Sequence, residues 1–215
     1  MAGLNFSSVG FVGALGGPAL ATNLSARLSL TNSSHMTTVG QAFALGLNWS
    51  IEMRVRSTNT DGVYVFNHYS SAGNRDYFGI IYGFVANTYE LYWPTNSTGA
   101  TQRLALPAVS DALQHIVRFT YDGTTIRGFL DGVAGATIAV ANVAQTLETN
   151  AVLTLGERAN NIFFAGDVDY LRITAGATNL VNLSFNEASG PAINAGTLGD
   201  FPFFGSGAGQ RVALP

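Results

Sequence analysis

Apolar and polar residues alternate in many short segments of this chain, and the alternation predicts β-strands. The clearest case is residues 49–56, WSIEMRVR, in which apolar positions strictly alternate with polar or charged ones. Successive side chains of a strand point to opposite faces, so this segment has one buried face and one solvated face. The other segments predicted as strands are residues 1–10, 23–31, 63–69, 77–84, 88–93, 151–155, 162–173, where Gly166 separates two strands, and 180–185.

Two Asp-Gly pairs, at residues 122–123 and 131–132, separate runs rich in Ile, Val, Phe, Tyr and Thr. Asp-Gly supplies the positive φ angles of tight hairpin turns, so the pairs predict an antiparallel meander. A two-residue turn at 122–123 would place Arg118 opposite Arg127, and like charges directly opposed destabilise a sheet. We therefore expect a four-residue loop there, which offsets the arginines; the alternative is an acidic or anionic partner between them.

Other local signals refine this picture. Residues Pro107–Leu113 predict one short helix, and Gly79 and Gly83 indicate a bulge or a close backbone approach within their strand. About a dozen short strands with almost no helical periodicity predict an all-β fold, an antiparallel sandwich or barrel. No repeat of the length typical of propellers or solenoids is present.

The chain length of 215 residues suits one domain with at most a tail. We expect a β-sandwich over residues 1–185 and a Gly/Phe-rich C-terminal tail over residues 186–215. Phe201, Phe203 and Phe204 make this tail too apolar for a free linker. The tail is therefore expected to pack on the sandwich or on a neighbouring subunit.

Charged residues are sparse, at 11% of the chain, against about 25% in a typical domain. All ten basic residues are arginines, and the net charge is −3. A nucleic-acid partner is not expected, because that would need a clustered basic surface. The longest apolar run, residues 11–21, is too short to cross a membrane, and no basic residue precedes Arg27 as in a signal peptide. We expect neither membrane insertion nor a signal peptide.

Five segments occur in the order found in laminin G-like and concanavalin A-like jelly rolls. They are LNF at 4–6, WSIEMRVRS at 49–57, HIVRFTYDGTTIRGFLDGV at 115–133, LTLGER with FFAGDVDYLRI at 163–173, and LSFNEASGPAINAGTLGD at 183–200. Over nearly its whole length, the chain resembles this family. The resemblance implies a β-sandwich of two curved antiparallel sheets. It does not define a function, because the fold serves lectins, adhesion modules, glycanases and capsid components.

No catalytic residue is predicted. A glycanase needs paired carboxylates, and no Glu-x-Asp-x-x-Glu pattern occurs. Asp167 and Asp169 share a strand face, but no third acid accompanies them, and the resemblance implies a structural role for both. The three histidines lack zinc-ligand spacing, and no Gly-x-Ser-x-Gly elbow appears. His115 is expected to be a packed residue at a strand edge.

Aromatic residues on the strands at 63–69 and 88–93 are candidates for stacking on sugar rings. The candidate glycan-binding residues are Tyr64, His68, Tyr69, Arg75, Tyr92 and Trp93. The alternative is that most of these rings fill the core. The resemblance also implies a calcium site, for which the loop residues Asp61, Asn74 and Asp76 are candidates. Ordinary Asx turns use the same residue types, and no other cofactor is predicted.

The favoured hypothesis is a non-catalytic jelly-roll module of a bacteriophage virion, either a capsid decoration protein or part of a tail fibre. A laminin G-like domain ordinarily works outside the cell, and a phage protein reaches that location by lysis. Its partners would be other virion proteins or further copies in a homo-oligomer, with cell-surface polysaccharide as a ligand. Its location would be the virion surface. The alternative is a free carbohydrate-binding lectin module, and a third hypothesis is a polysaccharide-degrading enzyme.

Overall fold

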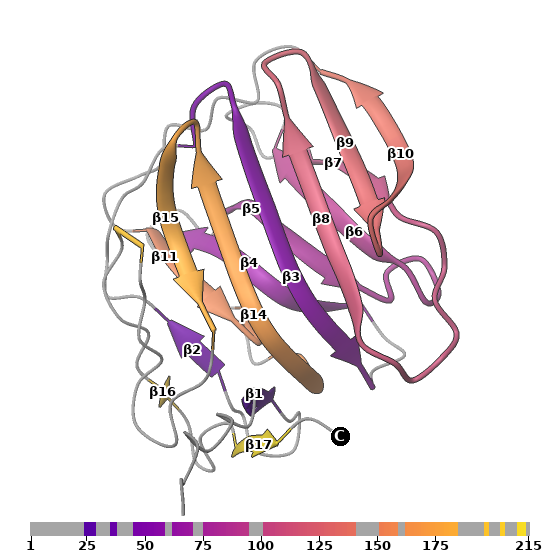
Figure 1. The fold of residues 1–215 in the computed structure, drawn as a ribbon, viewed down its shortest axis with the longest axis vertical. Coiled ribbons are helices and arrows are strands. Elements are labelled where there is room, and N and C mark those ends of the chain that lie inside the picture. The colour runs from indigo at the N-terminus through magenta and orange to yellow at the C-terminus, as the bar shows by residue number, and fades with distance from the viewer. Residues whose placement is uncertain are drawn as a thin grey trace, which may run out of the picture.

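The protein is a two-layered β-sandwich in the computed structural model (Figure 1). The structure describes residues 24–28, 35–37, 45–58, 62–70, 75–94, 101–140, 151–158, 162–184, 196–197, 203–204 and 210–213. All regular elements in these residues are strands, and every pairing between them is antiparallel. The predicted fold class, an all-β antiparallel sandwich of the jelly-roll type, is confirmed.

The sheet that faces the viewer in Figure 1 is called the front sheet. Its order is β10-β9-β8-β3-β14-β1-β17, and β15 also pairs with β14. The bounds of its strands are β1 Leu24–Leu28, β3 Trp49–Ser57, β8 His115–Tyr121, β9 Thr125–Leu130, β10 Val133–Ala139, β14 Gly166–Ala175, β15 Thr178–Leu183 and β17 Gln210–Ala213.

The sheet behind it is called the back sheet and has the order β16-β2-β11-β4-β5-β6-β7. The bounds are β2 His35–Thr37, β4 Val63–Ser70, β5 Arg75–Tyr82, β6 Tyr89–Pro94, β7 Thr101–Ala105, β11 Ala151–Leu155 and β16 Phe203–Phe204. A small third sheet joins β12 Glu157–Arg158 to β13 Ile162–Phe163. Two short strands of the 186–215 segment thus join the two large sheets, β16 beside β2 and β17 beside β1. The predicted division at residue 185 stays a prediction, and residues 1–10 lie outside the described residues.

The inner faces of the two sheets form the hydrophobic core. The alternation predicted for residues 49–56 is observed, because Ile51, Met53 and Val55 of β3 are fully buried. Opposite them lie buried rings and aliphatic chains from the back sheet, such as Phe66 and Leu91. Burying a side chain of this size stabilises the fold by about 1.5–3 kcal/mol. Since the inward positions of β3 are occupied in this way, its outward positions are left for solvent and ligands.

Four residues, 122–125, separate the last paired residues of the β8–β9 hairpin, as predicted. Tyr121 pairs with Ile126, so Arg118 pairs with Phe129 and Arg127 pairs with Thr120. The two arginines are therefore offset and not opposed. The second Asp-Gly pair forms a two-residue turn, in which Asp131 and Gly132 have φ angles of 52° and 80°. Positive φ at both positions is typical of a type I′ hairpin.

The prediction of a helix over residues 107–113 is wrong. This segment is an irregular connection between β7 and β8. Its backbone amides bond outside the segment or to side chains: Val109 N donates to Asn87 O at 2.8 Å, and Leu113 N donates to Asp111 Oδ1 at 3.2 Å. Such local bonds compete with the helical ladder, which explains the absence of a helix.

Of the two glycines noted in the sequence, Gly79 has the predicted role of a close backbone approach, whereas Gly83 lies after β5 and not within a strand. At Gly79 in β5, a Cβ atom would lie 2.5 Å from the carbonyl oxygen of Phe66, so only glycine allows this close approach. Gly83 follows the strand with a φ of 81°, which favours glycine. Among the described residues, no helix is long and apolar enough to cross a membrane.

Candidate functional site

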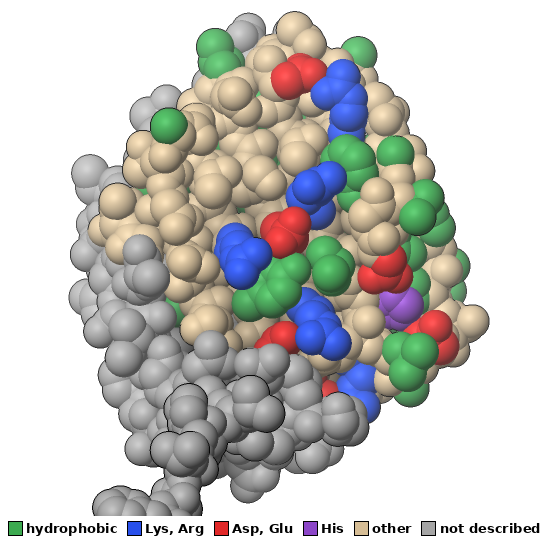
Figure 2. Space-filling view, viewed as in Figure 1, with side chains coloured by type: hydrophobic (Ala, Val, Ile, Leu, Met, Phe, Trp, Pro, Cys, Tyr) green, Lys and Arg blue, Asp and Glu red, His purple; other side chains and the backbone are tan. Residues whose placement is uncertain are grey.

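Charged side chains gather on the outer face of the front sheet. Five of the six arginines whose side chains the structure describes lie on this face, all except Arg103. Figure 2 shows blue side chains staggered from the top to the bottom of this face, with red acidic side chains among them. This surface, called the charged face, comprises Glu52, Arg54 and Arg56 of β3, Arg118 of β8, Asp122 of the next loop, Arg127 of β9, and Asp167, Asp169 and Arg172 of β14.

Strand register explains why opposite charges are neighbours on the charged face. Asp167 is paired in register with Arg56, and their side chains form an ion pair. Arg127 Nη1 lies 2.5 Å from Asp122 Oδ2, and this bond, with those from Thr124, holds the pKa of Asp122 below its usual range. Opposite charges on adjacent strands contribute to sheet stability. These contacts also fix long side chains in single positions.

A β-bulge in β14 turns two consecutive side chains outward. Val168 pairs with Val55 and Tyr170 pairs with Arg54, so Asp169 is an extra residue between them. Arg54 Nη1 donates to Asp169 Oδ2 at 3.1 Å, and Tyr170 Oη donates to Glu52 Oε1 at 3.0 Å. Burial raises the pKa of Asp169 although Arg54 opposes it; burial and Glu52 raise the pKa of Tyr170 to about 12. The phenol is therefore a hydrogen-bond donor at neutral pH.

Two arginines of the charged face stack on aromatic rings. The guanidinium carbon of Arg118 lies 4.2 Å from the ring centroid of Phe129, and that of Arg172 lies 4.6 Å from the ring of Tyr170. Cation–π contacts of this kind stabilise by about 0.5–1 kcal/mol at exposed sites. Arg172 Nη1 is also 3.7 Å from Glu52 Oε1. Within the described part of the chain, Arg118 forms no ion pair.

The rings proposed from the sequence as a sugar platform are mostly buried. His68 and Trp93 lie in the interior, with exposed fractions of 0% and 2%. Tyr92, at 2%, is on the opposite face of its strand and donates from Oη to Asn67 Oδ1 at 2.7 Å. Tyr64 is half-buried and meets the Tyr92 ring edge-on. Buried rings cannot stack on a sugar, so these residues do not form an open platform in this structure.

The other predicted site residues are described only in part. Tyr69 pairs with Asp76, and the next pair along β4 and β5 is Ser70 with Arg75, but only their backbone is described. Asp61 and Asn74 lie outside the described residues. The described residues contain no group of three or more His, Cys, Asp or Glu side chains suited to a metal. The calcium site stays a prediction.

His115 lies between two carboxylates at the start of β8. Its Nδ1 is 2.8 Å from Asp131 Oδ2, and its Nε2 is 2.7 Å from Asp111 Oδ1. Burial lowers the pKa of His115, but the two carboxylates outweigh burial, and the pKa is raised. An ionised carboxylate only accepts, so both contacts are hydrogen bonds when both ring nitrogens are protonated. These two contacts connect the 106–114 segment to the β9–β10 turn. His115 itself is only 9% exposed, as expected for a packed strand-edge residue.

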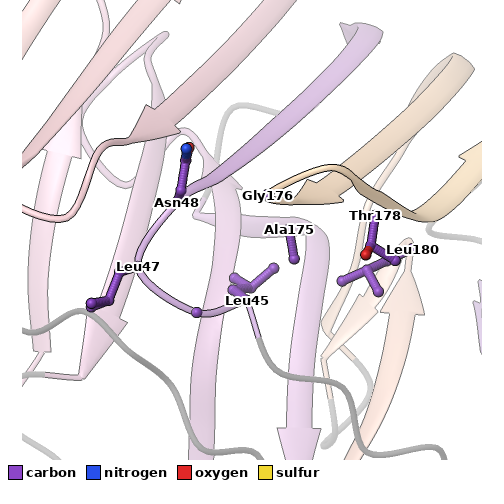
Figure 3. Close-up of a pocket in the computed structure, with 8 residues that line it drawn as sticks. Leu45, Leu47, Asn48, Ala175, Gly176, Thr178 and Leu180 are labelled. Atoms are coloured by element: carbon purple, nitrogen blue, oxygen red, sulfur yellow. The ribbon is translucent and has the colours of Figure 1, made fainter.

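A shallow pocket of about 460 Å³ lies where β3 begins and β14 turns into β15. Figure 3 shows Leu45, Ala175 and Leu180 converging on it. The described residues of its lining include no ionisable side chain. It lies beside the β8–β9 loop, because a Cβ atom at Gly123 would lie 3.3 Å from the carbonyl oxygen of Leu47, a lining residue.

The charged face was not predicted as a site from the sequence. The available signal was arginine at outward positions of several predicted strands, above all in WSIEMRVR. The order of the strands was needed to show that these arginines share one surface.

The two layers of antiparallel strands form a β-sandwich of the jelly-roll type. A family model described as the concanavalin A-like lectin/glucanases superfamily, of laminin G type, matches residues 30–180. The chain belongs to this superfamily, since the match covers well over half of its length, and the resemblance seen in the sequence is confirmed. No curated protein matches the chain in sequence.

Solved structures with the same fold are distant in sequence. A heptameric SAP-like pentraxin from Limulus polyphemus is 13% identical with a TM-score of 0.56, over 71% of this chain and 76% of the pentraxin. A Bacteroides ovatus protein with a proposed carbohydrate-binding role is 11% identical with a TM-score of 0.60, over 88% of this chain and 61% of that protein. Domains LG4-5 of the mouse laminin α1 chain are 17% identical with a TM-score of 0.54, over 70% of this chain and 42% of the laminin structure. At such identities the similarity shows the fold alone.

Proposed function

We propose that this protein is a non-catalytic carbohydrate-binding module and that it binds glycan on the charged face. The observation that carries the proposal is the gathering of five of six described arginines on one sheet face, in a chain with only 11% charged residues. Planar guanidinium and carboxylate groups make paired, directional hydrogen bonds, which suits recognition of polar ligands. Membership of a lectin superfamily supports this function.

The charged face is arranged for binding at low entropic cost. Arg54, Arg56 and Arg127 are each held by a carboxylate, and Arg118 and Arg172 are each held by a ring. Side chains that are already ordered lose less rotamer freedom when a ligand binds. The strands that carry these arginines pack on the core through their inward residues, so the backbone beneath the arginines is held in place.

Binding is favoured over hydrolysis because the acids of the charged face are engaged. A glycosidase needs one carboxylic acid as proton donor and a second carboxylate as nucleophile or base. Here Asp122, Asp167 and Asp169 each pair with an arginine, and Glu52 accepts the Tyr170 phenol. Release of sugar products from a polysaccharide, abolished by one Asp or Glu substitution, would overturn the non-catalytic assignment.

Arg172→Ala is expected to weaken glycan binding about tenfold or more, because a charge-assisted hydrogen bond contributes about 1.5–3 kcal/mol. A glycan array would select the ligand, and calorimetric titration would measure the affinity. Arg103→Ala is the matched control: Arg103 also stacks on a ring, that of Phe84 at 3.4 Å, but belongs to β7 of the back sheet. Equal affinities for both variants would contradict the proposed site, and so would a larger loss in the control.

The place of action proposed for the module is the surface of a bacteriophage virion. A lysine-free, weakly charged surface supports this idea, since it suits packing into a larger assembly. Co-sedimentation with phage particles or stable homo-oligomers is the expected result. A monomer with no affinity for any virion component would contradict it and leave the free lectin module as the better description.

A further inference from the structure

We propose that the charged face binds an acidic polysaccharide and that Arg118 and Arg172 contact its negatively charged group, a carboxylate or a sulfate. This inference rests on the proposed function of the charged face and adds the chemical class of its ligand. It follows from how positive charge is distributed within the face, which is uneven.

The centre of the charged face has two arginines for one acid. Arg172, Glu52 and Arg118 are paired in register across the adjacent strands β14, β3 and β8. Neighbouring strands are about 4.8 Å apart, so the two arginines begin about 10 Å from each other with Glu52 between them. These three residues in register therefore carry one excess positive charge. On either side of them, Arg54 and Arg127 each form an ion pair with an acid.

Glu52 does not neutralise both arginines. Its Oε1 accepts the Tyr170 phenol at 3.0 Å, and Arg172 Nη1 is 3.7 Å away, beyond the usual range of a hydrogen bond. The Glu52 side chain is also recessed, with 22% exposed against 56% for Arg172. A ligand approaching the face thus meets the guanidinium groups before the carboxylate.

Arg118 is half-buried and has no ion-pair partner among the residues that the structure describes. No ion pair of Arg118 occurs within the described part of the chain, and its Nε atom is buried. A partly desolvated charge is costly unless it is paired, so an anion from a ligand would be stabilised there. In contrast, Arg54 and Arg127 have carboxylate oxygens at 3.1 and 2.5 Å.

The aromatic contacts orient both arginines for such a ligand. Each guanidinium lies over a ring, at 4.2 Å for Arg118 on Phe129 and 4.6 Å for Arg172 on Tyr170. The N–H donors of arginine lie in the plane of the guanidinium, so stacking leaves them available to planar or tetrahedral oxyanions. Since the Tyr170 phenol is protonated at neutral pH, it adds no negative charge beside them.

The experiment compares acidic polysaccharides with neutral polysaccharides of the same backbone. The first pair is polygalacturonate and its carboxyl-reduced form, and the second is dextran sulfate and dextran. We expect the wild-type protein to bind at least one acidic member at least about tenfold more tightly than its neutral partner at low salt, with the preference shrinking as salt screens the charges. The pair that shows the preference identifies the anionic group as carboxylate or sulfate.

Variants assign the preference to particular residues. Arg118→Gln is expected to reduce acidic binding about tenfold to a hundredfold and to reduce neutral binding by a smaller factor. Arg118→Lys retains the charge but loses the planar donor fork, so an intermediate loss is expected. Arg103→Gln, which changes the net charge equally, serves as the control, and thermal unfolding verifies that each variant is folded. If Arg103→Gln lowers acidic binding as much as Arg118→Gln, the effect is one of overall charge and the inference is overturned.

The failure of this inference can be separated from failure of the proposed function. Equal binding of acidic and neutral polysaccharides that is still lost in Arg172→Ala would overturn the acidic specificity and leave glycan binding at the charged face standing. Binding that is unaffected by Arg118→Gln, Arg118→Lys and Arg172→Ala would overturn both. A protein that binds none of these polysaccharides and no glycan on an array would also overturn both.

Discussion

Trp93→Ala is expected to lower the free energy of unfolding by about 3–5 kcal/mol, the usual cost of removing a buried aromatic ring. Trp93 is 2% exposed and belongs to the core between the sheets. Urea unfolding followed by far-ultraviolet circular dichroism measures the change. Glycan binding by whatever fraction stays folded is expected to be retained, because the ring lies on the inner face of β6.

The matched control for Trp93 is Phe84→Ala, because Phe84 is an aromatic residue of the same region with 61% of its surface exposed. A loss below about 1 kcal/mol is expected for this variant, since its ring is mostly exposed and the cation–π contact with Arg103 contributes little. A Trp93→Ala protein with nearly unchanged stability and abolished glycan binding would contradict the structure. It would restore Trp93 as a sugar-stacking residue.

Acidification is expected to destabilise the protein through His68. Burial lowers the pKa of His68 from 6.5 to about 3, so its ring stays neutral in the folded state. Below pH 6.5 the unfolded chain binds a proton at His68 that the folded chain does not, and stability falls until the pH reaches the folded value. The expected slope is about 1 kcal/mol per pH unit between pH 6 and 4.

The variant His68→Phe isolates this effect, because it keeps a ring beside Phe78, on which His68 stacks at 5.4 Å, and removes the titrating group. Its unfolding free energy is expected to be flatter between pH 6 and 4 than that of the wild type. His115 does not affect this comparison, because its pKa is raised in the folded state and its ring is protonated in both states below pH 6.5. The stabilisation that His115 contributes is lost only as the pH rises through its folded pKa. Equal slopes in the two proteins would show that His68 is not buried as described.

Much of the fold was predictable because local rules and tertiary packing agree. The alternation in WSIEMRVR places Ile51 and Met53 inside and the charged residues outside, as observed. The repulsion argument for Arg118 and Arg127 correctly predicted a four-residue loop at Asp122-Gly123. Both inferences depend on neighbouring residues of one strand or hairpin, for which sequence spacing is sufficient.

One part of the predicted sugar platform, a shared face for Tyr64 and His68, is not observed because of a β-bulge. Simple alternation places Tyr64 and His68 on one face of β4. The register shifts between Tyr64 and Phe66, where Tyr64 pairs with Ile81 and Phe66 with Ile80. The extra residue reverses the alternation, so Tyr64 lies on the outer face while His68 points into the core. No residue in the segment VYVFNHYS marks the bulge; the glycine that accommodates the close approach, Gly79, is on the partner strand.

The charged face could not be predicted from the sequence for a different reason. Its arginines come from β3, β8, β9 and β14, and β14 lies more than one hundred residues after β3 in the chain. The register Arg172–Glu52–Arg118 exists only once these strands are adjacent. The alternation of apolar residues gives no direct information on that order, because many arrangements of a dozen strands bury the same apolar positions.

The most direct test of glycan binding on the charged face is an NMR titration of the arginine Nε–Hε signals. Only arginine side chains give signals of this type, and the chain has ten arginines, so the number of signals is small. With a glycan selected on an array, the signals of Arg118, Arg172 and Arg54 are expected to shift with a common affinity while that of Arg103 stays in place. A shift of the Arg103 signal with the charged face unchanged would contradict the proposed site and place binding on the back sheet.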